Sequence, residues 1–154
     1  MSANFQYRML SKKDLPRIMA IERQSFDTPW SAAIMRDSLL AAHTQVWGIF
    51  LDSTASLVGF GVLSVTLDEA EVLSMSVDAS HQRQGFGEKL LRFLIGKARD
   101  NGVKSLFLEV NVSHAAALKL YDKLGFRKIG VKKASYQDEA QVEAEDAVLL
   151  NLEL

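Results

Sequence analysis

Glu109 and Tyr121 have side chains suited to proton transfer and lie near each other in the sequence. Glu109 interrupts the apolar run of residues 106–110, where a carboxylate costs free energy unless it is paired, protonated or in contact with water. Such a carboxylate could act as a general base. Tyr121 lies in the following segment of helical spacing, and its phenol, with an ordinary pKa of about 10, could donate a proton to a departing thiolate. Together the two residue types are those of an acid–base pair.

Each of these two residues also has a plainer interpretation. Glu109 could lie on the solvent face of its strand or pair with a nearby Lys or Arg, and the strand pattern alone favours this interpretation. Tyr121 could be a tyrosine at the edge of the core, because Ala117, Leu118 and Leu124 around it have the spacing of a packed helix face. The occurrence of both residues in one strand-to-helix unit is what favours chemistry.

Residues 82–87, with the sequence Gln-Arg-Gln-Gly-Phe-Gly, form a second candidate site. They follow the alternating strand pattern of residues 72–77 and open a helix. The two glycines let the backbone approach a ligand closely, and the first N–H groups of a helix lack intrahelical partners, so the loop suits a phosphate group. A Walker loop would end in Gly-Lys-Ser/Thr, and a dinucleotide loop would need a third glycine where Leu90 stands. The alternative is an ordinary turn between a strand and a helix.

The hydrophobic periodicity predicts the elements that must position these residues. Two helices are expected in the first part of the chain, where a capping box at residues 11–14 and the pair Pro29 and Ser31 mark their starts. The predicted strands are residues 5–9, 45–51, 57–67, 72–77, 103–112, 126–133 and 142–154, and the predicted helices are 14–25, 31–40, 86–100 and 113–124. We therefore expect an α/β fold in one domain, 1–154, with a mixed, mostly antiparallel sheet of about six to seven strands and about four flanking helices.

Composition excludes several classes of function. The chain has 154 residues and a formal charge of −1, which gives no basic field of the kind that nucleic-acid binding uses. It has no Cys and only three scattered His residues, so we expect no thiol nucleophile and no metal site. Neither a signal-peptide core nor a membrane-spanning run of apolar residues is present in the sequence, and a cytoplasmic protein is expected.

The loop and the Glu109 segment both resemble one known family, the GCN5-related N-acetyltransferases (GNAT). The closest likeness is to the bacterial RimI-type ribosomal-protein alanine acetyltransferases, and it covers nearly the whole chain. The matching runs are Leu-Asp-Glu-Ala at 67–70, the loop at 82–87, Leu-Glu-Val at 108–110, Ala-Ala-Ala at 115–117, Leu-Tyr at 120–121 and Leu-Gly-Phe at 124–126, together with Pro-Trp-Ser at 29–31 and Tyr136.

The resemblance implies roles for individual residues. Glu109 would be the general base and Tyr121 the general acid. Acetyl-CoA would bind along Met75, Ser76 and Val77 and in the pyrophosphate loop formed by Arg83, Gln84, Gly85, Phe86, Gly87 and Glu88. His114 stands where the group usually has an Asn that contacts the cofactor, and a solvent-exposed histidine at a helix start is the alternative. Trp30 and Tyr136 would border the peptide groove, although a Trp beside a helix start can also be a core-edge residue.

The implied activity is transfer of acetyl from acetyl-CoA to the N-terminal alanine of ribosomal protein bS18, without a metal and without an acyl-enzyme. An α-amino group has a pKa near about 8, against about 10.4 for Lys, which suits a modest carboxylate base and favours a protein N-terminus. Two alternatives remain open. The first is acetylation of lysine side chains or of a small amine, and the second is a CoA-binding module without chemistry.

Overall fold

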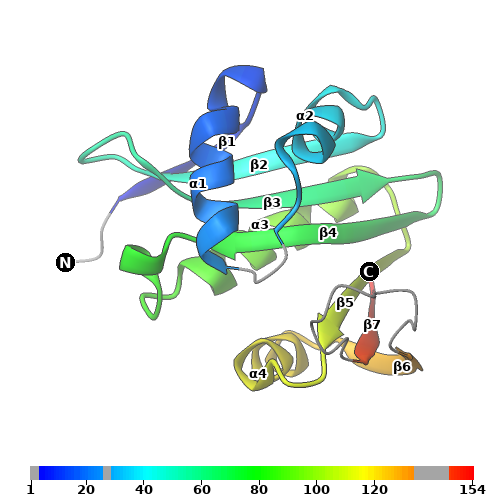
Figure 1. Cartoon of the computed structure of the whole chain (residues 1–154). Coiled ribbons are helices and arrows are strands. Elements are labelled where there is room, and N and C mark those ends of the chain that lie inside the picture. The colour runs from blue at the N-terminus through cyan, green and yellow to red at the C-terminus, as the bar shows by residue number, and fades with distance from the viewer. Residues whose placement is uncertain (1–3, 26–28, 134–145) are drawn as a thin grey trace.

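The computed structural model describes residues 4–25, 29–133 and 146–154 (Figure 1). The strands are β1 (Phe5–Met9), β2 (Thr44–Leu51), β3 (Leu57–Val65), β4 (Glu69–Val77), β5 (Ser105–Asn111), β6 (Arg127–Lys132) and β7 (Ala147–Glu153). The α-helices are α1 (Leu15–Ser25), α2 (Ala32–Leu40), α3 (Phe86–Asp100) and α4 (Ala115–Lys123), and short 3₁₀ turns lie at Lys12–Asp14 and Ala79–His81.

The strands form one seven-stranded sheet in the order β1-β2-β3-β4-β5-β7-β6. Successive strands from β1 to β4 pair antiparallel, as do β5 with β7 and β7 with β6. The pair β4–β5 alone is parallel, because the chain crosses over through α3 between them. The expected mixed, mostly antiparallel sheet is confirmed.

Helices cover both faces of the sheet (Figure 1). On one face, α1 and α2 bury Ile18, Ile21 and Met35 against Phe60 and Val62 of β3. On the other face, α3 buries the apolar stripe that its sequence predicts, and α4 packs beside the same cluster. These two apolar layers, one on each side of the sheet, are called here the α1 face and the α3 face.

The helix boundaries follow local capping. The Ser31 Oγ accepts a hydrogen bond of 3.1 Å from the Ile34 N–H and so begins α2. The Ser11 N–H donates to Asp14 Oδ2 at 2.9 Å before α1, which fits the expected capping box. After α3, Gly102 takes the left-handed conformation, with φ 78°, that a helix end commonly needs.

A β-bulge in β4 changes the face on which its side chains lie. Leu63 of β3 pairs with Val72, but the neighbouring Val62 pairs with Ser74, so Leu73 has no opposite residue. Before the bulge, Val72 lies on the α3 face; after it, Ser74 lies on the α1 face. Without the bulge, strand alternation would have put both residues on one face.

The strands β4 and β5 separate in the middle of the sheet. Their ladder runs from the pair Glu69–Ser105 to the pair Val72–Leu108, and no further pair between them is formed in the described part of the chain. Residues 73–77 of β4 and 109–111 of β5 therefore continue as diverging strands. No helix among the described residues is long and apolar enough to cross a membrane.

Candidate active site

The diverging part of β4 presents main-chain groups toward the side from which β5 has departed. The Asp78 N–H donates to the Val58 carbonyl of the β3 side at 2.8 Å. Because hydrogen-bonding directions alternate along an antiparallel pair, Ser76 also faces β3, whereas Met75 and Val77 face the opposite way. Met75 and Val77 thus offer peptide groups that no β5 ladder uses, and the main chain of Ser76 is already paired.

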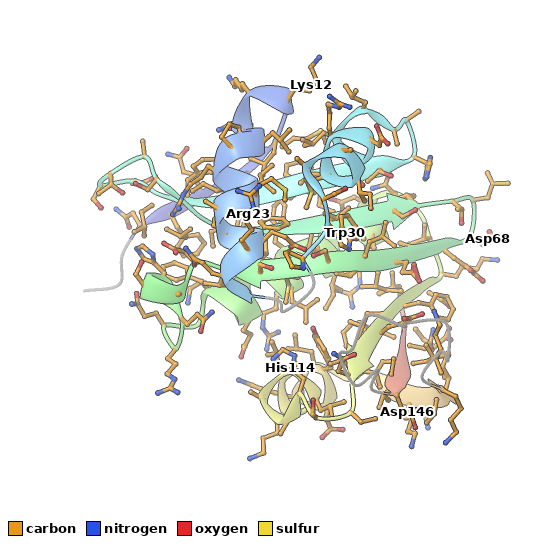
Figure 2. All side chains as sticks on the ribbon, viewed as in Figure 1. Lys12, Arg23, Trp30, Asp68, His114 and Asp146 are labelled. Carbon is orange, nitrogen blue, oxygen red and sulfur yellow. The ribbon has the colours of Figure 1, made fainter. Side chains whose placement is uncertain are left out.

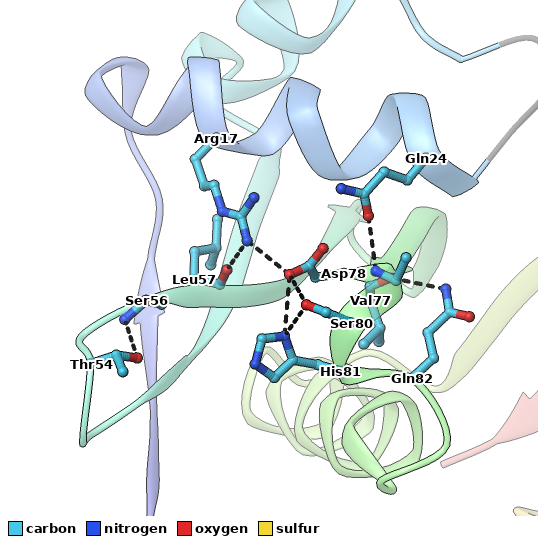
Figure 3. Close-up of polar contacts among 11 residues, drawn as sticks. Arg17, Gln24, Thr54, Ser56, Leu57, Val77, Asp78, Ser80, His81 and Gln82 are labelled. Atoms are coloured by element: carbon cyan, nitrogen blue, oxygen red, sulfur yellow. Dashed lines mark hydrogen bonds and ion pairs between the residues drawn. The ribbon is translucent and has the colours of Figure 1, made fainter.

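Gln82 connects the loop to this strand. Its Nε2 donates a hydrogen bond of 3.2 Å to the Val77 carbonyl, drawn in Figure 3. This bond uses the Val77 carbonyl, one of the β4 main-chain groups that face away from β3, and it fixes the start of the loop. Gln82 is the first residue of the sequence motif, and its role here is to join loop and strand.

The loop ends in the free N–H groups of α3. Gly85, the N-cap, has φ 84°, and Arg83 has φ 63°, which is uncommon for a residue with a side chain. The first helical bond in this turn runs from the Lys89 N–H to the Gly85 carbonyl at 3.1 Å, so the preceding N–H groups are left for an anion. Arg83 and Gln84 are exposed, whereas the Phe86 side chain is buried in the core, so only its main chain can face a ligand.

Glu88 lies in the first turn of α3 but does not leave that turn with an unbalanced negative charge. Its carboxylate accepts from Lys123 Nζ of α4 at 2.7 Å and from Arg92 Nε at 3.0 Å. These hydrogen bonds, that of Lys123 first, hold the pKa of Glu88 below its ordinary value. The pair with Lys123 also joins the start of α3 to the end of α4.

Asp78 joins α1 to the loop (Figure 3). Its Oδ2 accepts from Arg17 at 3.0 Å and from Ser80 at 2.9 Å, and it lies 3.1 Å from Nδ1 of His81. Burial alone would raise the pKa of Asp78, but the hydrogen bonds from Ser80, His81 and Arg17 and the Arg17 charge outweigh it and lower the pKa to about 2. Beside this group, the Ala79 N–H donates to Gln24 Oε1 of α1 at 2.9 Å.

Glu109 lies on the α1 face of β5, one residue beyond the last β4 pair. Its neighbours Leu108 and Val110 are buried on the α3 face, and strand alternation puts Glu109 opposite them. Its side chain is 46% exposed, and Oε1 is 3.9 Å from Lys132 Nζ of β6. Glu109 is thus both accessible to solvent and close to a lysine.

Tyr121 belongs to the other layer. It is half-buried on α4, packs against the α3-face core and meets the Phe126 ring edge to face, with centroids 5.8 Å apart. Burial raises the pKa of its phenol, so the hydroxyl keeps its proton at neutral pH. Glu109 and Tyr121 therefore approach β5 from opposite faces.

A buried carboxylate on α1 positions the segment that carries Trp30. Glu22 is 1% exposed; its Oε2 accepts from the Trp30 N–H at 3.0 Å and its Oε1 from Ser74 Oγ at 3.4 Å. The Trp30 ring packs against the α1-face core, and Figure 2 shows it over the sheet on that face. Next along β4, the buried Ser76 Oγ finds no hydrogen-bond partner among the described residues.

Two further candidate residues lie apart from these groups. His114 is the exposed N-cap of α4, without a side-chain hydrogen bond to the helix, at the start of α4 in Figure 2. Tyr136 lies outside the described residues, within the undescribed range 134–145. No group of three or more His, Asp or Glu side chains able to hold a metal ion occurs within 4–25, 29–133 and 146–154.

Sequence reasoning did not single out Glu22 or Asp78 as structural supports of the site, and it placed Gln82 in the loop without assigning it a role of its own. For Glu22 a signal was present, because it follows Ile18 and Ile21 at the spacing of the buried helix face, where a carboxylate needs partners. For Asp78 no local pattern indicates Arg17, which is far away in the sequence.

Comparisons with known proteins agree with this geometry. Residues 15–126 match the model of the acetyltransferase (GNAT) family. The [ribosomal protein bS18]-alanine N-acetyltransferase of Escherichia coli strain K12 is 33% identical over 143 residues, 93% of each chain. A crystal structure of the ribosomal-protein-S18-alanine N-acetyltransferase from Escherichia coli superposes with a TM-score of 0.87 at 31% identity, over 97% of this chain and 94% of that one.

The fold is also shared with a protein whose structure contains acetyl-CoA. This GNAT family acetyltransferase from Elizabethkingia anophelis has a TM-score of 0.78 at 22% identity, over 99% of this chain and 100% of that one. The diverging strands β4 and β5, the loop before α3 and the family match all indicate the same kind of protein. The chain belongs to the GNAT family and is an acetyl-CoA-dependent N-acetyltransferase.

Proposed function

We propose that the protein acetylates the α-amino group of an N-terminal alanine, that of ribosomal protein bS18. The likeness to the Escherichia coli bS18-alanine N-acetyltransferase, over 93% of both chains, carries this proposal. The acceptor is a protein N-terminus, and we expect neither direct nucleic-acid binding nor a membrane partner.

The residues at the divergence fit acetyl-CoA. Peptide groups of Met75 and Val77 that no β5 ladder uses suit the amide-rich arm of the cofactor and its thioester carbonyl. The loop at 82–87 and the free N–H groups of α3 suit its pyrophosphate. Exposed cations at Arg83 and Lys89 add positive charge there, and Glu88 does not oppose it because Lys123 and Arg92 neutralise its charge.

Glu109 and Tyr121 would share the proton transfers. Glu109 takes a proton from the acceptor ammonium group, directly or through a water. The amine nitrogen then bonds to the acetyl carbon, and a main-chain N–H of Met75 or Val77 stabilises the negative oxygen. The carbon–sulfur bond breaks, and the Tyr121 hydroxyl gives its proton to the thiolate. The second proton that the nitrogen loses on becoming an amide restores the Tyr121 hydroxyl through solvent, and Glu109 releases its own proton to solvent. Glu109 and Tyr121 lie on opposite faces of β5, and this supports the division of roles between base and acid. The acceptor would then approach from the α1 face and the cofactor from the α3 face.

Mass spectrometry of a synthetic peptide that begins with Ala and contains an internal Lys tests the substrate. We expect acetyl at the N-terminus. Acetyl on Lys alone would favour the lysine alternative, and acetyl-CoA binding without any acetylated amine would favour a non-catalytic module.

Exchange of Glu109 tests the mechanism. Glu109→Gln should lower kcat by about 10²-fold or more while the acetyl-CoA Kd, measured by calorimetry, stays within about twofold. Glu69→Gln makes the same chemical change at an exposed position of β4, outside the site, and should leave kcat unaltered. Equal turnover in the two variants would contradict the assignment of Glu109.

A further inference from the structure

Glu71 lies beside Glu109 on the α1 face, where β4 and β5 separate. Glu71 pairs in register with Phe107, and Glu109 is two residues further along β5 on the same face. This makes the two glutamates diagonal neighbours on adjacent strands, with their Cα atoms roughly 8 Å or more apart. Glu71 is half-buried, and its register partner on β3 is Ser64, which carries no charge.

Lys132 reaches the same place from β6. Its neighbour Val131 pairs with Val148, which is buried on the α3 face, so alternation puts Lys132 on the α1 face with both glutamates. Its Nζ is 3.9 Å from Glu109 Oε1. Two carboxylates and one ammonium group thus lie on this face, and the cluster has one negative charge more than it has positive charges.

The electrostatics of Glu71 agree with this placement. Burial raises the pKa of Glu71, the negative charge of Glu109 raises it further, and the Lys132 ammonium offsets part of the effect. Glu69 of β4, Glu153 of β7 and Arg127 of β6 also lie on this face by strand register. Glu22 of α1, which packs on the same face, is bonded to Trp30 and Ser74. The charges that shift the pKa of Glu71 are those of Glu109 and Lys132.

We propose that Glu71 is a positioning residue of the acetyltransferase: it compensates Lys132, so that Glu109 is free to bind the acceptor ammonium group and take its proton. The proposal rests on Glu109 being the base of the proposed function. It assigns to Glu71 a part in acceptor binding that depends on charge.

Charge balance gives the reason. With a cationic amine bound, the cluster holds two carboxylates and two cations and is neutral. After the proton moves from the amine to Glu109, the remaining charges are the Glu71 carboxylate and the Lys132 ammonium, which compensate each other. Without Glu71, Lys132 would compete with the acceptor for Glu109, and its uncompensated charge would oppose proton uptake by Glu109.

Steady-state kinetics of Glu71→Gln with an Ala-starting peptide tests the proposal. We expect the acceptor KM to rise about three- to tenfold while the acetyl-CoA KM stays within about twofold. The acid limb of kcat/KM should move to lower pH by about half a pH unit or more, because one charge roughly 8 Å away shifts a pKa by nearly that much in bulk water and by more near a protein surface. A merely structural role for Glu71 would not move the pH profile.

Two variants serve as controls. Glu69→Gln makes the same exchange two residues earlier on the same face of β4, and should give wild-type kinetics. Glu71→Gln combined with Lys132→Met restores the net charge of the cluster, and should return both the acceptor KM and the acid limb toward wild-type values. If Glu71→Gln behaves as Glu69→Gln does, or if the double variant is no better than Glu71→Gln, the proposal is wrong.

A measurement without catalysis separates this proposal from the proposed function. In a carboxyl ¹³C NMR titration, the pKa of Glu71 should fall when Glu109 is replaced by Gln and stay unchanged in Glu69→Gln. An unchanged pKa in Glu109→Gln overturns the coupling even if the enzyme is active. A lowered pKa in an enzyme that does not acetylate Ala peptides would leave the cluster in place and reject the substrate instead.

Discussion

The Trp30 N–H donates to Glu22 Oε2 at 3.0 Å, and this bond joins the start of α2 to the buried side of α1. Glu22→Ala would leave this N–H and the Ser74 hydroxyl without their acceptor in a buried place. We expect the free energy of unfolding to fall by about 2–4 kcal/mol, measured by urea denaturation. The exposed neighbour Arg23→Ala should change it by less than about 0.5 kcal/mol. An equal loss in both variants would mean that helix α1, rather than the hydrogen bonds, is being perturbed.

Asp78 should make stability depend on pH in the acid range. Its folded pKa, about 2, is below its ordinary value of 3.8, so its contribution is complete above about pH 4 and is lost as the pH falls toward 2. Asp78→Asn should lower stability by about 1–2 kcal/mol at pH 7, a figure discounted because the partner Arg17 side chain is 42% exposed. The difference between the two proteins should close near pH 2, and a constant difference across this range would contradict the ion-pair account.

Substitution by Ala should have opposite effects on stability at Gly85, the N-cap of α3, and at Gly96, inside the same helix. Gly85 has φ 84°, and an added Cβ would lie 3.4 Å from Lys89 Nζ, so Gly85→Ala should cost about 1–2 kcal/mol and weaken acetyl-CoA binding. An added Cβ at Gly96 meets nothing within 4 Å, so Gly96→Ala should stabilise the helix by about 0.5–1 kcal/mol. Thermal unfolding and calorimetric titration with acetyl-CoA would measure both effects. Unaltered acetyl-CoA affinity in Gly85→Ala would argue against the loop as a pyrophosphate site.

Tyr121→Phe should lower kcat by about 10²-fold and leave the acetyl-CoA Kd nearly unchanged, because it removes one hydroxyl. Since burial raises the pKa of Tyr121 above 10.0, its ionisation should cause no loss of wild-type activity below about pH 10. A pH–kcat profile over the alkaline range tests this expectation. An alkaline limb near pH 8 that disappears in Tyr121→Phe would mean that the phenol environment differs from the one described.

Several features of the fold could be predicted from sequence because their signals are local. The apolar stripe of α3 recurs at helical spacing, and Ser31 precedes its helix in the order that capping requires. The loop before α3 was identified by its glycines, and Gly85 takes the left-handed conformation that makes a glycine useful there.

The rest depends on pairing between distant segments. Residues 72–77 have an alternating pattern that gives no sign of the bulge at Leu73, because a bulge is set by the partner strand. Nothing near β7 in the sequence indicates that it lies between β5 and β6. Charges that meet across the sheet, such as Glu109 with Lys132, likewise come from strands that are not neighbours in the chain.

The bulge at Leu73 reverses, within a single strand, which alternate side chains lie on which face of the sheet. Before it, even-numbered side chains of β4 lie on the α3 face; after it, odd-numbered ones do, so Met75 and Val77 join the α3-face core while Ser74 and Ser76 lie on the α1 face. Without Leu73, Ser74 would follow Val72 directly, and ordinary alternation would keep both side chains on their present faces and in their present register. A deletion of Leu73 should therefore disturb the strand less than a deletion of a paired residue such as Ser76, which would turn Val77 to the other face.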